Sequence, residues 1–153
     1  MNKLENFIAG RWLTEDGDGQ LVYDAVTGDS FVAASTKGID MPAMLHYARK
    51  TGNANLRRMT FHDRGRMLRD LALHLLDHKE KFYSISYKTG ATKAESWVDI
   101  EGGIGNLFAY ASLRRKFLDL PYTYDSEGYN LSKMGSFMGH HLMVPKEVAI
   151  HTM

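Results

Sequence analysis

Residues 90–113 constrain the fold of this chain more than any other stretch, because they combine a helical apolar stripe with three glycines. Apolar residues recur there at steps of three and four, which places them on one face of a helix. The stripe consists of Trp97, Ile100, Ile104, Leu107, Phe108 and Ala111. Gly102, Gly103 and Gly105 each cost about 1 kcal/mol against alanine inside a helix. The sequence therefore predicts a helix stabilised by a partner segment, most simply a backbone that packs closely against the glycines.

The same glycines could instead form a phosphate-binding loop. Loops of that kind follow a buried strand and open a helix. Residues 94–101 are helix-forming and amphipathic, and no hydrophobic strand comes before them. The pattern favours glycines that pack within a helix over glycines that bind a nucleotide.

Length and composition are those of one ordinary globular domain. The chain has 153 residues, of which 44% are hydrophobic and 24% charged, and this length can bury a core. A net charge of +1 argues against nucleic acid or a membrane as a partner held by bulk electrostatics. No apolar run approaches the roughly 18 residues that span a bilayer. The amino terminus lacks the apolar core of a signal peptide, so the mature chain is expected to begin at Met1. The absence of cysteine suits the expected cytoplasmic location.

Short apolar segments separated by glycine turns predict a β meander over residues 5–36. The expected strands contain Phe7, Trp12, Val22 and Val32. A meander this small must lie against something larger. Trp12 is expected to anchor that packing, because an indole buries a large area.

Residues 40–116 are predicted to be helical. Asp40 is a suitable N-cap for a first helix, and its apolar stripe is expected to close near Gly52. Thr60 and Asp63 have the spacing of a capping box, in which each side chain hydrogen-bonds the backbone of the other. A second helix is predicted to start there.

Two clusters on the predicted helices could bind ligands. His74 and His78 are four residues apart, a spacing that metal sites use, but no third ligand is evident and exposed surface histidines are the simpler interpretation. The second cluster is basic and could bind phosphate. It consists of Arg57, Arg58, Arg64, Arg66 and Arg69. Asp63 and Asp70 lie among these arginines, which favours a solvated, salt-bridged face.

The remaining residues are predicted to form a loop over 117–134 and a β hairpin over 135–153. His140, His141 and His151 could meet across that hairpin. A metal site of three histidines needs more than strand proximity, so this hypothesis rests on pairing alone.

Several segments together resemble the aldehyde dehydrogenase superfamily. They are GATK at 90–93, SWVDIEGGIGNLFAYAS at 96–112, FIAGRW at 7–12, AVTGD at 25–29 and GIDM at 38–41. The stretch 96–112 is similar, more narrowly, to the aldehyde dehydrogenase half of the bifunctional oxepin-CoA hydrolase/semialdehyde dehydrogenases of phenylacetic acid degradation. The likeness covers nearly the whole chain.

The resemblance implies the α/β fold of that family, of which residues 1–153 would be an α+β N-terminal portion, truncated before the cofactor-binding core. The implied role is that of a scaffold segment in NAD(P)-dependent oxidation of a CoA-linked semialdehyde to the acid, in phenylacetate catabolism. Two alternatives stay open: another semialdehyde dehydrogenase of the same branch, as in benzoyl-CoA breakdown, or a non-catalytic α+β interaction module.

No catalytic, cofactor-binding or metal-ligating residue can be carried over from the family. Its members attack the aldehyde with a cysteine thiolate, and this chain has no cysteine. NAD or NADP would serve the complete enzyme, and neither is expected to bind this chain alone, which should be inactive. The expected partners are the remainder of the dehydrogenase domain, further copies in a homo-oligomer and, for the complete enzyme, a CoA-linked aldehyde.

Overall fold

The computed structural model describes residues 2–14, 17–124, 129–130, 133, 138–139 and 142–143. Its N-terminal strands are β1 (Asn2–Lys3), β2 (Asn6–Ile8), β3 (Arg11–Leu13), β4 (Gln20–Tyr23) and β5 (Ser30–Ala34). Strand β5 pairs with β1 in parallel and with β4 in antiparallel orientation, giving the order β1-β5-β4. Strands β2 and β3 form a separate hairpin. The strands predicted around Phe7, Trp12, Val22 and Val32 are confirmed.

Trp12 does not anchor a core among the described residues. Its side chain is 64% exposed, and it packs against the equally exposed Phe7 with ring centroids 5.1 Å apart. Both residues lie on the β2–β3 hairpin, opposite each other in register. The hairpin turns at Ala9 and Gly10, which both have positive φ, and such a two-residue turn matches the twist of the paired strands.

The first helical region is a continuous rod made of α1 (Met41–Tyr47), the π-helical η1 (Ala48–Asn53) and α2 (Ala54–Arg58). Asp40 caps it as predicted, since its carboxylate accepts a hydrogen bond from the Ala43 amide at 2.9 Å. The predicted end near Gly52 is wrong. Glycines that end helices commonly adopt a left-handed conformation, but Gly52 lies inside η1 without a positive φ, and the helical chain continues to Arg58.

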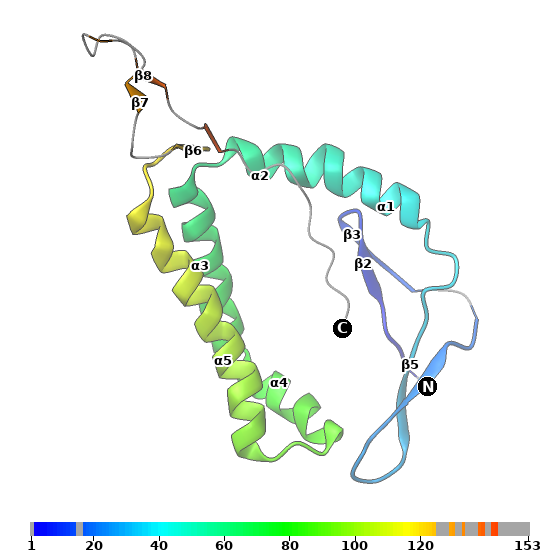
Figure 1. The fold of residues 1–153 in the computed structure, drawn as a ribbon. Helices are drawn as coiled ribbons and strands as arrows, with labels where there is room; N and C mark the ends of the chain where they lie inside the picture. Colours follow the sequence, from blue (N-terminus) through cyan, green and yellow to red (C-terminus); the bar gives the residue numbers. More distant parts are fainter. Residues whose placement is uncertain are drawn as a thin grey trace.

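Two capping boxes start the long helices. Thr60 and Asp63 form the predicted one at α3 (Phe61–Asp77), and Thr92 and Glu95 form another at α5 (Lys93–Ser112). Between these helices lie α4 (Lys79–Ser86) and the 3₁₀ turn η2 (Tyr87–Thr89), which ends at Gly90 with φ 83°. A further 3₁₀ turn, η3 (Leu113–Lys116), follows α5. Figure 1 shows α3 and α5 side by side, with the α1–α2 rod leading from them to the N-terminal strands.

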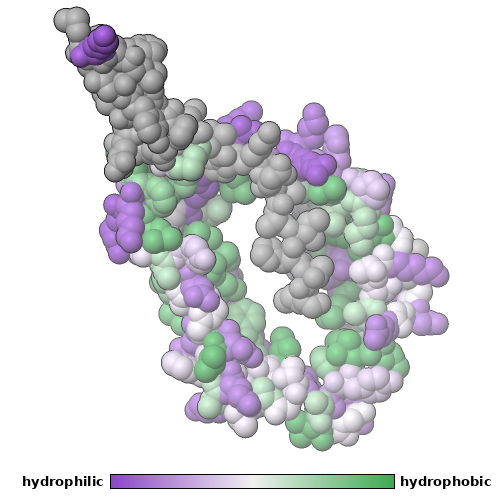
Figure 2. Space-filling model, viewed as in Figure 1, coloured by the Kyte–Doolittle hydropathy of each residue, from purple (hydrophilic) through white to green (hydrophobic). Residues whose placement is uncertain are grey.

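The core lies between α3 and α5 and is small. The buried apolar residues of the described chain are Ala33, Ala72, Tyr83, Ile104 and Ala111. Most of the predicted stripe on α5 is at least half-buried there, but Trp97 is 56% exposed. Many other large apolar side chains also reach the surface, and Figure 2 shows them on both the strand and the helical parts. The described residues therefore leave much apolar area uncovered.

The predicted close packing at Gly102, Gly103 and Gly105 is wrong for this part of the chain. All three glycines are exposed, and a Cβ added to any of them would meet no atom within 4 Å. The close approach is at Gly65 in α3, where an added Cβ would lie 2.8 Å from Cβ of Arg114 and 3.1 Å from the Ala111 carbonyl oxygen. Gly65 therefore sets the distance between α3 and the end of α5.

The C-terminal strands pair differently from the prediction. They are β6 (Thr123–Tyr124), β7 (Tyr129–Asn130), β8 (Met138–Gly139) and β9 (Leu142–Met143). Strand β6 pairs with β9 and β7 with β8, both antiparallel. The segment predicted as a loop thus supplies β7, the partner of β8, and β6, the partner of β9. The proposed triad of His140, His141 and His151 lies outside the described residues.

Candidate functional site

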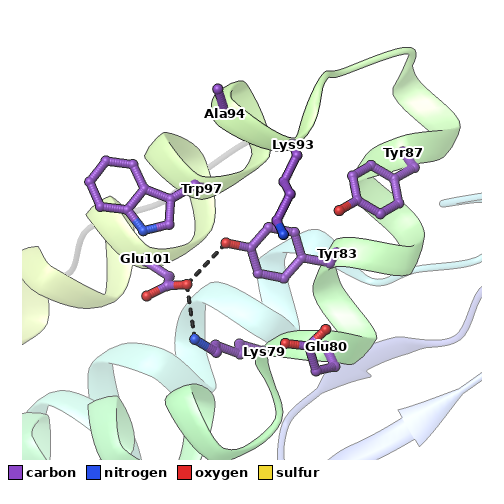
Figure 3. Close-up of a pocket in the computed structure, with 8 residues that line it drawn as sticks. All are labelled: Lys79, Glu80, Tyr83, Tyr87, Lys93, Ala94, Trp97 and Glu101. Atoms are coloured by element: carbon purple, nitrogen blue, oxygen red, sulfur yellow. Dashed lines mark hydrogen bonds and ion pairs between the residues drawn. The ribbon is translucent and has the colours of Figure 1, made fainter.

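A groove of about 730 Å³ lies between α4–η2 and the first half of α5 (Figure 3). Its lining includes Lys79, Glu80, Tyr83, Tyr87, Lys93 and Trp97. Small-molecule sites have volumes of roughly 300–1,000 Å³ and combine apolar walls with a few polar groups. The groove falls within this range of volume, and its lining combines aromatic side chains with four charged ones.

Two rows of side chains form the groove, and both have a spacing of four residues. Lys79, Tyr83 and Tyr87 form the row on α4–η2. Residues four apart lie on one face of a helix, so the row points in one direction.

The facing row is on α5 and consists of Lys93, Trp97 and Glu101. The chain turns back at Gly90 between the two helices, so the rows run in opposite directions. This places Lys79 opposite Glu101, and the two side chains form an ion pair at 3.0 Å.

Glu101 links the two rows of side chains by hydrogen bonds. Its Oε1 atom accepts hydrogen bonds from Lys79 Nζ and from the Tyr83 hydroxyl, each at 3.0 Å. These two bonds, the one from Lys79 first, lower the pKa of the Glu101 carboxyl. Burial, followed by the bond to Glu101, raises the pKa of Tyr83 to about 12. Both shifts favour an ionised Glu101 that accepts a hydrogen bond from a protonated Tyr83.

The upper part of the groove is open to solvent. Trp97 and Tyr87 are 56% and 41% exposed, and Figure 3 shows them on opposite sides of Lys93. Lys93 is exposed, and within residues 17–124 it takes part in no ion pair. These three side chains are available to a ligand.

The glycines of α5 do not form a phosphate loop in the structure. Gly102, Gly103 and Gly105 lie in the middle of a 20-residue helix, whose backbone amides are used by its own hydrogen bonds. A phosphate loop needs free amides between a strand and a helix. The alternative that these glycines bind a nucleotide is wrong.

His74 and His78 lie side by side at the end of α3. Their ring centroids are 4.4 Å apart, and His78 Nδ1 lies 2.9 Å from the His74 carbonyl oxygen. In the described ranges no group of three histidine, aspartate or glutamate side chains is arranged to hold a metal ion. The pair alone supplies too few ligands for a zinc site.

The basic cluster is partly the salt-bridged face that was predicted. Arg66 contacts Asp63 at 2.6 Å, and Arg69 lies 3.9 Å from Asp70. Arg64 differs, because its guanidinium lies over the Phe61 ring at 4.3 Å and burial lowers its pKa. The cluster therefore does not present one uniform phosphate-binding surface.

Sequence reasoning missed the groove. The signal that could have found it is the repeated spacing of four on two successive helical segments, 79–87 and 93–101. Each row alone resembles an ordinary helix surface, and the site exists only because the turn at Gly90 brings the rows together.

No family model matches the chain. Over 144 residues the chain is 30% identical to the 3,4-dehydroadipyl-CoA semialdehyde dehydrogenase of Aromatoleum evansii. This similarity supports an aldehyde dehydrogenase relationship. The match covers 94% of the chain but 28% of the relative, so the chain spans less than a third of that protein's length. Among the described residues, no helix is both long and apolar enough to cross a membrane.

Proposed function

We propose that this chain is the N-terminal scaffold segment of an NAD(P)-dependent aldehyde dehydrogenase that oxidises a CoA-linked semialdehyde to the acid. The observation that carries the proposal is the similarity to a CoA-linked semialdehyde dehydrogenase over 94% of the chain. The exposed apolar side chains around a small core support it, because such area is normally covered by further polypeptide. The remainder of the dehydrogenase domain is the proposed cover, and a homo-oligomer is the proposed assembly.

Aerobic phenylacetate breakdown is the proposed pathway, on the resemblance of residues 96–112. A second candidate is another semialdehyde dehydrogenase of the same branch, as in benzoyl-CoA breakdown. The relative's name favours keeping this candidate, since it specifies 3,4-dehydroadipyl-CoA semialdehyde as that protein's substrate.

The described residues do not fit the redox site for NAD or NADP. Dinucleotides bind where a glycine loop joins a buried parallel strand to a helix. The one parallel pair in the described ranges, β1 with β5, is two residues long and leads into no such loop. We therefore assign this chain a positioning role and derive no catalytic step from it.

A chimaera tests the proposal. The aligned segment of the Aromatoleum evansii protein is replaced by this chain, and NAD(P)H formation is followed with 3,4-dehydroadipyl-CoA semialdehyde. We expect turnover, because the segment supplies scaffold while the remainder supplies the reacting groups. A chimaera that melts cooperatively but oxidises no CoA-linked semialdehyde would contradict the proposal. A matched chimaera with Gly65→Leu is the control, and it should lose its cooperative melt along with turnover.

A further inference from the structure

We infer that the groove between α4–η2 and α5 binds an adenosine that carries a phosphomonoester. Coenzyme A ends in such a group, so under the proposed function the groove would hold the distal end of the CoA-linked substrate. Only this choice of source rests on the proposed function. The ligand chemistry itself is argued from the groove.

The row on α5 offers three different contacts in a line. Lys93 is a cation, Trp97 an aromatic plate and Glu101 a carboxylate, each separated from the next by four residues. Eight residues of helix rise by about 12 Å. That span is comparable to the distance from the exocyclic amine of adenine to the phosphate of adenosine monophosphate. A ligand lying along α5 can therefore contact all three side chains.

Trp97 provides the aromatic surface for the base, whereas Tyr87 lies on the other side of Lys93, at the phosphate end of the groove. Both side chains are substantially exposed, and they flank the groove from α5 and from η2. Stacking on aromatic side chains is a common way to bind a nucleobase, since every base has a π face. Tyr83 lies beneath them, buried, with its ring centroid 6.1 Å from that of Tyr87.

Glu101 can accept hydrogen bonds from the edge of the base. Its Oε1 atom is occupied by Lys79 and Tyr83, whereas no hydrogen bond within the described residues uses its Oε2 atom. The exocyclic amine of adenine is a donor that suits this carboxylate oxygen. The ion pair with Lys79 also offsets the carboxylate's charge, which reduces repulsion of a bound phosphate.

Lys93 is the partner for the phosphate. It is the first residue of α5 and is exposed, and the capping box of Thr92 and Glu95 already satisfies the helix end beside it. The lysine, rather than the backbone, is thus the available anion contact. Glu80 also lines the groove, but Figure 3 shows it beside Lys79, at the end away from Lys93.

A single lysine discriminates between classes of phosphate. A phosphomonoester has a charge of about −1.5 to −2 at pH 7, whereas each phosphate of a diphosphate bridge has a smaller charge. Adenosine monophosphate and CoA should therefore bind more tightly than NAD, which has no monoester.

The test is a fluorescence titration of Trp97. The chain has two tryptophans, so a Trp12→Phe variant isolates the signal, and it is studied below the ~10 μM at which association is expected. We expect saturable quenching by adenosine monophosphate in the millimolar range or below. Lys93→Met should weaken that binding by roughly tenfold, as loss of a charge-assisted contact does. Adenosine lacks the phosphate, so its affinity for the parent groove should be about as weak as the affinity of adenosine monophosphate for the Lys93→Met variant. The Lys93→Met change should not alter the affinity for adenosine.

Lys116→Met is the matched control, because Lys116 is an exposed lysine outside the groove, and it should leave binding unchanged. Competition by CoA and by NADP distinguishes the two sources of an adenosine phosphomonoester. The inference fails if adenosine monophosphate gives no saturable quenching, or if Lys93→Met binds as tightly as the parent while both melt alike. Because the readout is fluorescence and not turnover, either outcome leaves the result of the dehydrogenase chimaera unaffected.

Discussion

Lys88 donates to the buried carboxylate of Asp24 at 3.1 Å, and this ion pair joins the N-terminal strands to the helices. Asp24 follows β4, and its Oδ1 atom also accepts from the backbone amide of Val26 at 2.9 Å. The backbone reinforces the link, since the Ala25 amide donates to the Lys88 carbonyl at 2.7 Å. Two segments 64 residues apart are thus connected through one carboxylate and one backbone hydrogen bond.

Asp24 should make the stability of the chain sensitive to acid. The hydrogen bond from Val26, followed by the one from Lys88, lowers the pKa of Asp24 below its usual value of 3.8. Its contribution to stability is therefore fully present above that value and is lost as the pH falls through the lowered pKa. Asp24→Asn should lower the melting temperature by several degrees at pH 7 and reduce the further loss of stability below pH 3.8.

Thermal melts across this pH range provide the measurement for Asp24. Asp29→Asn is the control, because Asp29 is exposed and no ion pair of the described residues includes it. Equal melting profiles for the two variants would show that the link between Asp24 and Lys88 does not stabilise the fold.

Gly65→Ala and Gly103→Ala should change stability in opposite directions. At Gly65 the new methyl group would meet Arg114 Cβ at 2.8 Å, and overpacking of this kind typically costs ~1–3 kcal/mol. At Gly103 the methyl group would meet no atom within 4 Å, so the helix should gain ~1 kcal/mol from better propensity. Urea denaturation of the two variants measures both effects. Destabilisation by Gly103→Ala would mean that another segment packs on the glycines after all.

The chain alone should neither oxidise aldehydes nor bind NAD at concentrations below ~1 mM, an affinity of about 4 kcal/mol. Aldehyde dehydrogenases form a covalent intermediate between the aldehyde and a cysteine thiolate. This chain has no cysteine that could form it. NAD(P)H absorbance with a panel of semialdehydes and calorimetry with NAD are the measurements. NAD-dependent turnover by the purified chain would refute the scaffold role.

The isolated chain should associate at ~10 μM, a concentration at which exposed apolar surface already drives contacts. Phe7, Trp12, Val26 and Tyr110 are each more than half exposed, and buried apolar area stabilises an interface by ~25 cal/mol per Å². Sedimentation velocity is the test. A single monomeric species with a cooperative melt would show that the apolar surface needs no partner.

Local signals predicted the starts of helices well. Asp40, Thr60 and Asp63 act as caps because capping depends on residues three positions apart, and the structure shows each of these contacts. The burial of Trp12 could not be predicted from local signals in the same way. Its burial depends on what covers the β2–β3 hairpin, which the neighbouring residues do not encode.

The glycines also show that sequence alone does not reveal tertiary contacts. Gly102, Gly103 and Gly105 attract attention because they cluster, yet among the helical glycines the close contact is at Gly65. A glycine's role depends on which atoms lie opposite it, and Arg114 is far from Gly65 in sequence. The groove was missed for a related reason, since its two rows come together only through the turn at Gly90.

The π-helical segment η1 has a consequence for any helical wheel drawn through residues 41–58. A π turn accommodates an extra residue without breaking the rod, and each added residue rotates all later side chains by about 100°. A projection with constant period that begins at Met41 would therefore assign Leu56 and its neighbours to the wrong face. Sequence comparisons across this rod need a one-residue gap within η1 (Ala48–Asn53) wherever a relative has an unbroken α-helix.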